Sequence, residues 1–184
     1  MNRALLCLVA LLAGCTSVPG KTTEEKRAFI QEFEQETLEQ LHQEHPEAKA
    51  ALAEAPGYVV VRQKVTKVPL VGGGGGYGVV VDGRSDERTY MKLRRLDLGG
   101  GYGVRSTRIV LILHEPELVD EVKSGKWRFG AGAEAAAKAG EAGAAGGGGT
   151  GGNEAYTSYQ LTDAGVSATV TINALRLSPY KSLN

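Results

Sequence analysis

The chain has 184 residues, a formal net charge of zero and only two cysteines. This length fits one domain. Both cysteines, Cys7 and Cys15, belong to the N-terminal segment, so the rest of the chain excludes a disulfide framework, a thiol nucleophile and a cysteine-ligated metal. A strongly basic stripe is absent from the sequence, which argues against nucleic-acid binding.

The N-terminus has the order of regions that a secretory signal requires. Arg3 supplies a positive charge, residues 4–12 are almost wholly apolar, and Leu12-Ala13-Gly14-Cys15 follows. The apolar run is far shorter than the roughly 20 residues that span a bilayer. The four residues that end at Cys15 resemble the lipobox of bacterial lipoproteins. An ordinary secretory signal is the alternative.

The lipobox resemblance carries several expectations. It implies that residues 1–14 are a signal peptide, that residues 15–22 are a lipidated tether, and that Cys15 carries the acyl chains, palmitate among them. Several acyl chains make a durable membrane anchor. Thr16 rather than Asp follows Cys15, which in the sorting rule of such proteins favours the outer membrane, facing the periplasm, over the inner membrane.

Charge is unevenly distributed along the chain. Residues 21–57 hold four basic and nine acidic side chains, whereas residues 58–128 hold thirteen basic and eight acidic ones. One interpretation is that the acidic arm and the basic centre attract each other within the fold. The other is that the basic centre forms a face that meets anionic lipid headgroups.

Two helices are predicted ahead of the basic centre. Thr22 and Glu25 have capping-box spacing, and apolar residues recur at helical spacing after them, which predicts a helix of about 20 residues ending near His45. Pro46 suits the first turn of a second helix, and Pro56-Gly57 ends it. The predicted helical region is therefore 23–55.

The chain changes to a strand-like pattern at Tyr58. Short β-branched or alternating segments recur from there to the C-terminus. A short helix is predicted between Glu115 and the stop at Ser124-Gly125. The predicted strands are 58–61, 79–81, 90–98, 108–113, 156–161 and 166–177.

Residues 131–145 give conflicting signals. Their alanine-rich composition favours a helix, yet apolar residues fall on alternate positions and glycines interrupt any helix. Residues 146–152 are nearly all glycine, which is typical of a flexible loop.

Two glycine blocks are similar to each other. Residues 70–79 and 98–104 both contain Gly-Tyr-Gly and lead into a β-branched segment. A Gly-x-Gly-x-x-Gly pattern occurs at residues 73–78, but no helix pattern follows it, so a nucleotide site is disfavoured. Glycines packed in bent strands are the better interpretation.

The sequence supplies no catalytic constellation, and we expect no enzyme activity and no cofactor. His42 and His45 share a helix without a third metal ligand, so no metal site is expected. A nucleophile elbow is absent as well. Trp127 is the single tryptophan; core packing is the default interpretation, and an interfacial anchor is the alternative.

Several segments together resemble the SYLF domain family, a family of lipid-binding domains. They are Pro46-Glu47-Ala48-Lys49 leading into residues 57–61, Leu70-Val71-Gly72-Gly73 leading into residues 78–81, residues 99–103 with Arg105, Gly125-Lys126-Trp127-Arg128-Phe129-Gly130-Ala131, and Tyr159-Gln160-Leu161-Thr162. The resemblance covers residues 45–184 and is closest to the bacterial lipoprotein branch. It implies binding of anionic lipid, and it favours a strand over residues 131–145.

These observations lead to one expectation for the whole chain. The fold class is α+β, with an N-terminal helical hairpin packed on a curved, glycine-rich antiparallel sheet, and a barrel-like closure as an alternative. Residues 23–184 form one SYLF-like domain, helical over 23–55 and β-rich over 58–184. The partners are the membrane, through the acyl anchor, and anionic phospholipid; the alternative is a structural or protein-interaction module of the envelope. The candidate lipid-binding residues are Arg62, Lys64, Lys67, Lys92, Arg94, Arg105, Arg108, Lys126, Trp127 and Arg128.

Overall fold

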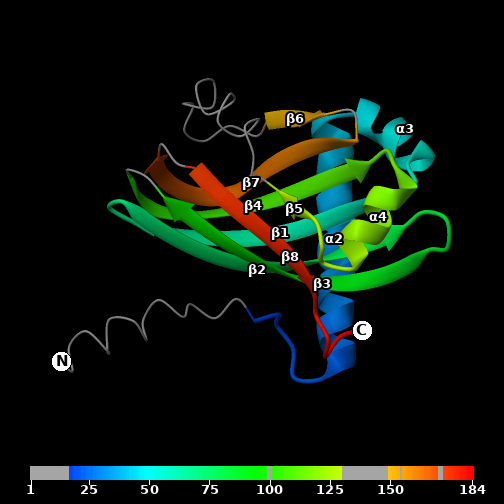
Figure 1. Ribbon diagram of the computed structural model, residues 1–184, viewed down its shortest axis with the longest axis horizontal. Coiled ribbons are helices and arrows are strands. Elements are labelled where there is room, and N and C mark those ends of the chain that lie inside the picture. Colours follow the sequence, from blue (N-terminus) through cyan, green and yellow to red (C-terminus); the bar gives the residue numbers. More distant parts are fainter. Residues whose placement is uncertain (1–16, 99–100, 130–148, 154, 170–171) are drawn as a thin grey trace.

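The protein contains helices and an antiparallel sheet, which confirms the predicted α+β class (Figure 1). The computed structural model describes residues 17–98, 101–129, 149–153, 155–169 and 172–184. The helices are α2 (Thr23–Glu44), α3 (Glu47–Glu54) and α4 (Pro116–Lys123). The strands are β1 (Gly57–Val68), β2 (Val71–Asp82), β3 (Glu87–Leu98), β4 (Gly101–Leu113), β5 (Arg128–Phe129), β6 (Gly149–Asn153), β7 (Tyr156–Thr169) and β8 (Ile172–Pro179).

Helix α2 begins at the predicted capping box. The Thr22 side chain accepts a hydrogen bond from the Glu25 backbone N–H, and the Glu25 carboxylate accepts one from the Thr22 N–H. The helix ends at Glu44, close to the predicted end. Helix α3 has eight residues, against 22 in α2, and a paired helical hairpin is not confirmed.

A buried carboxylate fixes α2 to the sheet. The Tyr58 hydroxyl of β1 donates a hydrogen bond of 2.6 Å to Glu34 Oε1, and Arg88 Nε of β3 lies 3.3 Å from Glu34 Oε2. Burial, followed by the hydrogen bond to Glu34, raises the pKa of Tyr58 well above its ordinary value. Tyr58 is therefore a neutral donor at every physiological pH.

The strands form one antiparallel sheet in the order β5-β8-β3-β2-β1-β4-β7-β6. Six of these strands are long, and the short strands β5 and β6 lie at the edges. Within the described residues the two edge strands do not pair with each other. The sheet is therefore open, and the barrel alternative is not confirmed.

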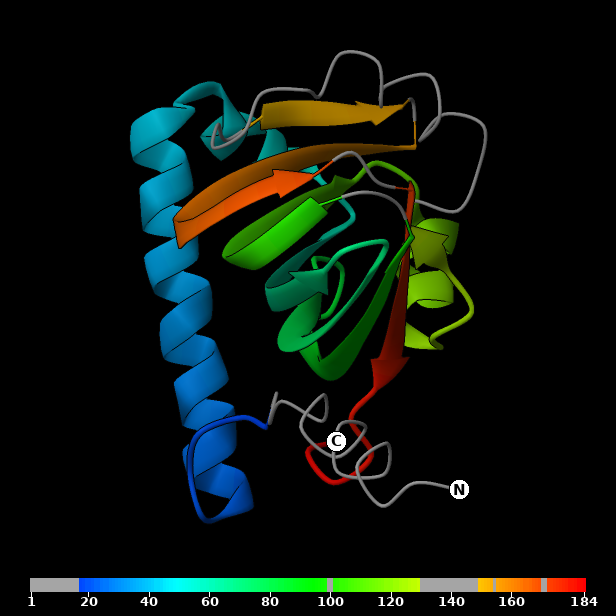
Figure 2. The ribbon, with the colours of Figure 1, turned by 90° about the vertical axis from the view of Figure 1, so that its left-hand side faces the viewer.

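The connections require strong curvature. Strands β7 and β8 are separated by four other strands in the sheet, yet only residues 170–171 lie between them in the chain. Three residue steps span at most about 11 Å, whereas five strand spacings in a flat sheet span about 24 Å. The sheet must therefore curl at this end, as Figure 2 shows.

Each face of the curled sheet packs against its own helix (Figure 2). On the outer, convex face, Val60, Val79 and Val110 form a core with Ile30 and Phe33 of α2. The inner, concave face packs against α4; that core contains Val59, Val61, Met91, Leu111, Val119 and Val122. The alternation along each strand thus assigns every residue to one face.

The first glycine block lies within β2, where it permits the curl. A Cβ atom on Gly76 or Gly78 would overlap the carbonyl oxygen of Arg62 or Val60 on β1. A Cβ atom on Gly73, on the outer face, would have as its nearest neighbour the Arg95 carbonyl oxygen at 4.0 Å. The interpretation as glycines in bent strands is confirmed, because the concave side has no space for side chains there.

One predicted strand was wrong. Residues 166–177 are not a single strand: the part up to Thr169 belongs to β7 beside β4, and the part from Ile172 belongs to β8 beside β3. Alternation continues through both strands, so the pattern alone cannot locate the crossover. The strand expected over residues 131–145 lies outside the described residues.

Candidate lipid-binding surface

The structure divides the predicted basic residues between the two faces of the sheet. Arg62, Lys64, Lys92, Arg94 and Arg108 occupy outer-face positions, whereas Lys67 and Arg105 occupy inner-face positions. Lys126 and Trp127 follow α4, and Arg128 begins β5, opposite Arg176. The ten predicted residues therefore do not form one surface.

The outer-face cations lie in two adjacent rows across the strands. Arg108, Arg62 and Lys92 belong to the row that contains Tyr77. Lys64 and Arg94 belong to the next row, which β8 extends with the exposed Arg176. We call Arg62, Lys64, Lys92, Arg94, Arg108 and Arg176 the basic belt. Sequence reasoning missed Arg176, because its position depends on the pairing of β8 with β3.

The helix glutamates neutralise only part of the belt. Arg108 lies 3.8 Å from the Glu36 carboxylate and 5.5 Å from the centre of the Phe33 ring. Lys92 Nζ lies 3.8 Å from the centre of the Tyr180 ring. Lys64 and Arg94 are exposed and form no ion pair within the described part of the chain. Both interpretations of the charge pattern thus apply, each to different residues.

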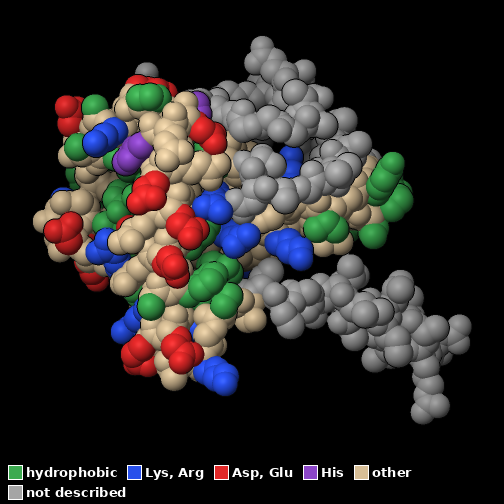
Figure 3. Space-filling view, turned by 180° about the vertical axis from the view of Figure 1, so that it is seen from behind, with side chains coloured by type: hydrophobic (Ala, Val, Ile, Leu, Met, Phe, Trp, Pro, Cys, Tyr) green, Lys and Arg blue, Asp and Glu red, His purple; other side chains and the backbone are tan. Residues whose placement is uncertain are grey.

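Exposed apolar side chains lie beyond the belt, at the ends of the strands. We call these residues the apolar tip: Val68, Leu70, Val71, Leu96, Tyr102 and Val104. In the register, Val104, Thr66, Gly73 and Leu96 form the row that follows Lys64 and Arg94. Rows of one face are about 7 Å apart. Figure 3 shows basic side chains next to α2 and apolar side chains at the far end of the sheet.

Leu70 is the most unusual residue of the tip. It is 70% exposed, and its φ of 77° lies in the left-handed region. With Pro69 before it, Leu70 occupies the third position of a type II turn, where glycine or asparagine is preferred. Both the backbone and the exposure therefore disfavour leucine in water.

Trp127 packs into the fold rather than extending from it. Its ring meets the Tyr156 ring edge to face at 5.5 Å, and both rings border the inner-face core. The default interpretation of core packing is confirmed, and the alternative of an interfacial anchor is not supported by this position.

An ion-pair network joins α4 to the end of β2. Asp82 accepts hydrogen bonds from Arg84 Nε at 2.8 Å and from Lys123 Nζ at 3.0 Å. The Arg84 guanidinium, which outweighs the effect of burial, holds the pKa of the Asp82 carboxyl well below its usual range. This network fixes the helix and does not contact the belt or the tip.

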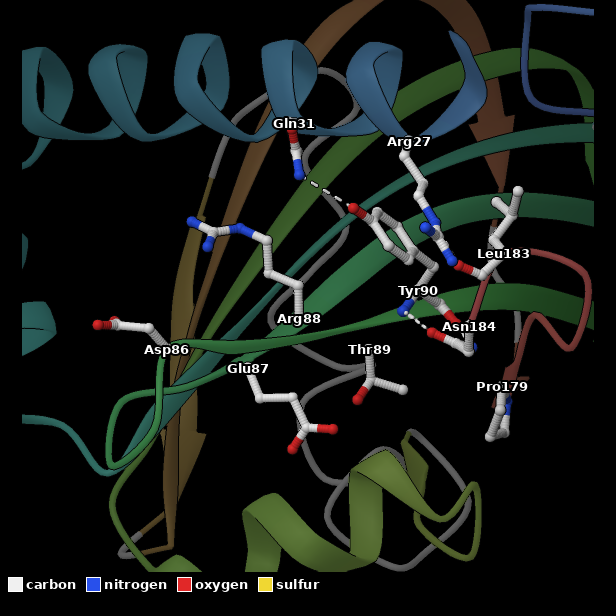
Figure 4. Close-up of a pocket in the computed structure, with 10 residues that line it drawn as sticks. All are labelled: Arg27, Gln31, Asp86, Glu87, Arg88, Thr89, Tyr90, Pro179, Leu183 and Asn184. Atoms are coloured by element: carbon white, nitrogen blue, oxygen red, sulfur yellow. Dashed lines mark hydrogen bonds between the residues drawn. The ribbon is translucent and has the colours of Figure 1, made fainter. Parts of the chain in front are cut away.

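A cavity of about 570 Å³ lies between α2, the start of β3 and the C-terminus (Figure 4). Gln31 Nε2 donates to the Tyr90 hydroxyl at 3.0 Å, and Arg27 Nε donates to the Leu183 carbonyl at 2.7 Å. Tyr90 N donates to Asn184 Oδ1 at 2.8 Å. These polar groups form hydrogen bonds with one another, so we interpret the cavity as the place where the C-terminal residues are attached to α2 and β3.

Comparisons with known proteins leave the family open: no protein-family model and no curated protein matches the chain. Within the described residues, no group of three or more His, Cys, Asp or Glu is arranged to hold a metal. None of the described helices is long and apolar enough to cross a membrane.

Proposed function

We propose that this chain is a lipid-anchored protein of the bacterial cell envelope whose SYLF-like domain binds anionic lipid surfaces and catalyses no reaction. The observation that carries the proposal is the order along the strands: a helix-covered core, then the basic belt, then the apolar tip. A surface that enters a bilayer needs apolar groups at its leading end and cations one layer behind, at headgroup depth.

The apolar tip is the part that enters the bilayer. In water, Leu70 is unfavourable because of both its positive φ and its exposed apolar side chain. Transfer of this side chain into hydrocarbon is favourable. Val68 and Val71 pair across the same turn, so the three side chains form one apolar end of the hairpin. An outlier of this kind supports a functional role for the residue.

The lipid anchor supplies a second attachment to the membrane. Val18 is 2% exposed and packs in the outer-face core together with Tyr77 and Phe33. Cys15 is three residues away in the chain, at most about 11 Å. An acyl chain on Cys15 therefore holds the domain near the membrane, and the anchor and the domain surface combine into stable attachment.

The acidic surface of α2 limits how the domain approaches. Glu32, Glu36 and Glu39 are exposed on this helix, and an anionic bilayer repels them. A tip-first approach keeps α2 behind the belt, which resolves the conflict between an acidic helix and an anionic lipid.

Flotation of a soluble form without Cys15 tests this function. We expect it to float with vesicles that contain phosphatidylglycerol more than with phosphatidylcholine vesicles, and high salt should release it. Equal recovery with both vesicles would reject recognition of anionic headgroups and favour the alternative, a structural or protein-interaction module. Fractionation of the full chain tests the outer-membrane location.

A further inference from the structure

The inner face holds a buried ammonium group that has no partner. Lys67 of β1 is only 4% exposed, and its Nζ atom makes no hydrogen bond within the described residues. A buried charge without a partner is costly, and proteins normally satisfy it with a counter-ion or a hydrogen bond. The position therefore calls for an anionic group.

Two guanidinium groups belong to the same region of the inner face. Arg95 of β3 and Arg105 of β4 share one row, with Gly74 and Val65 between them. Lys67 lies in the next row, diagonal to Arg105, a relation that places Cβ atoms about 7–8 Å apart, within reach of long side chains. Three cationic residues thus share a small part of the concave face with one acidic residue, Asp97 of β3, which lies in the row of Lys67 beyond Gly72.

The residues directly opposite Lys67 on both neighbouring strands are glycines. Its register partners on the adjacent strands are Gly72 and Gly103, neither of which has a side chain. Lys67 is also one residue from the end of β1, so it lies at the mouth of the curled sheet.

The two arginines already have partners, which fix them in place. Arg95 donates to the carbonyl oxygen of the buried Gln63 side chain at 3.3 Å. Arg105 also makes contacts with other groups. The ammonium of Lys67 differs from them because it lacks any partner in the described chain.

We infer that Lys67, with Arg95 and Arg105 beside it, binds a phosphate group on the inner face at the mouth of the sheet. Phosphate oxygens suit this set, since guanidinium groups match their geometry and an ammonium adds a point charge. The group comes either from free phosphate or from a lipid headgroup. The site is separate from the outer surface, and inorganic phosphate tests it without any membrane.

The experiment compares thermal unfolding of the full chain in non-ionic detergent, with phosphate or with chloride at equal ionic strength. We expect phosphate to raise the unfolding temperature of the wild type. In Lys67→Met this gain should vanish, and phosphate affinity should fall about tenfold to a hundredfold. Lys49→Met is the control, because Lys49 is an exposed lysine of α3 that belongs to neither the inner face nor the basic belt; it should keep the gain.

Without phosphate, Lys67→Met should be at least as stable as the wild type, because it removes an unpaired buried charge. No gain of the wild type in phosphate, an equal gain in Lys67→Met, or a Lys67→Met that is less stable in chloride would each overturn the site. Short-chain phosphatidylglycerol below its micelle concentration distinguishes the sources: tighter binding than inorganic phosphate assigns a headgroup, and weaker binding assigns free phosphate. The flotation result does not affect these outcomes.

Discussion

Lys64 of β1 and Arg94 of β3 lie opposite the same residue, Gly75 of β2, which has no side chain to stand between them. Both side chains are exposed on the outer face. The two strands are about 10 Å apart. The pair therefore presents two positive charges together, at the centre of the basic belt.

Reversing these two charges should weaken binding to anionic vesicles. Each cation near an anionic surface contributes about 1 kcal/mol, so Lys64→Glu with Arg94→Glu should lower affinity at least about thirtyfold. Lys64 is preferable to Lys92, whose ammonium lies against the Tyr180 ring. Flotation at several salt concentrations measures the change. The control Lys49→Glu, an exposed lysine of α3, should bind nearly as the wild type does; unchanged binding of the double variant contradicts the belt's role.

Leu70→Asn should separate binding from stability. Asparagine tolerates the positive φ at this turn, so the unfolding temperature should stay the same or rise. Binding to vesicles should fall, since the variant loses an apolar side chain worth about 2 kcal/mol in hydrocarbon. Calorimetry and flotation of one preparation test both parts. A variant that binds normally would show that the apolar tip stays in water.

Cys15→Ala should release the full chain from membranes into the soluble fraction at high salt, where the basic belt no longer holds it. The prediction rests on the resemblance of Leu12-Ala13-Gly14-Cys15 to a lipobox. The variant loses the acyl chains that make attachment durable. Labelling with radioactive palmitate, followed by fractionation, measures the effect. Label still incorporated into the variant would disprove acylation at this residue.

Gly76→Ala should destabilise the protein far more than Gly73→Ala. The new Cβ at position 76 meets the Arg62 carbonyl oxygen on the crowded concave side, and the cost should reach several kcal/mol, about 3 or more. Position 73 has no atom nearer than 4.0 Å, so its effect should stay within about 0.5 kcal/mol. Urea unfolding measures both free energies. Similar losses in the two variants would mean that curvature does not require glycine at position 76.

Asp82 should make the free energy of unfolding depend on pH. Its pKa is lowered in the folded state, so its contribution is complete above the ordinary value of 3.8 and is lost as the pH falls below it. Asp82→Asn should therefore cost about 2–3 kcal/mol at neutral pH and flatten the acid limb of the stability curve. Thermal unfolding between pH 7 and about pH 2 records this. Asp86→Asn, at an exposed turn, is the control and should keep the acid limb.

The sequence by itself determined the local structure of this protein. The capping box at Thr22 and Glu25 defines the start of α2, because both partners lie within one helical turn. Alternation in residues 90–98 correctly placed Lys92 and Arg94 on one face and Leu93 on the other, because side chains alternate along any strand. The glycine block, likewise, already indicated bent strands.

Only the tertiary structure decided which strands are neighbours. The sequence groups Lys64 with Arg105 as candidates for one surface, yet the register of β1 with β4 places Lys64 on the outer face and Arg105 on the inner face. Lys64, Arg94 and Arg176 lie on one surface because the strands are ordered β8-β3-β2-β1. Residues 166–177 belong to two strands because the chain crosses from β7 to β8 within two residues. Register and strand order arise from contacts between distant segments, and periodicity, which is a property of each segment alone, carries no information about them.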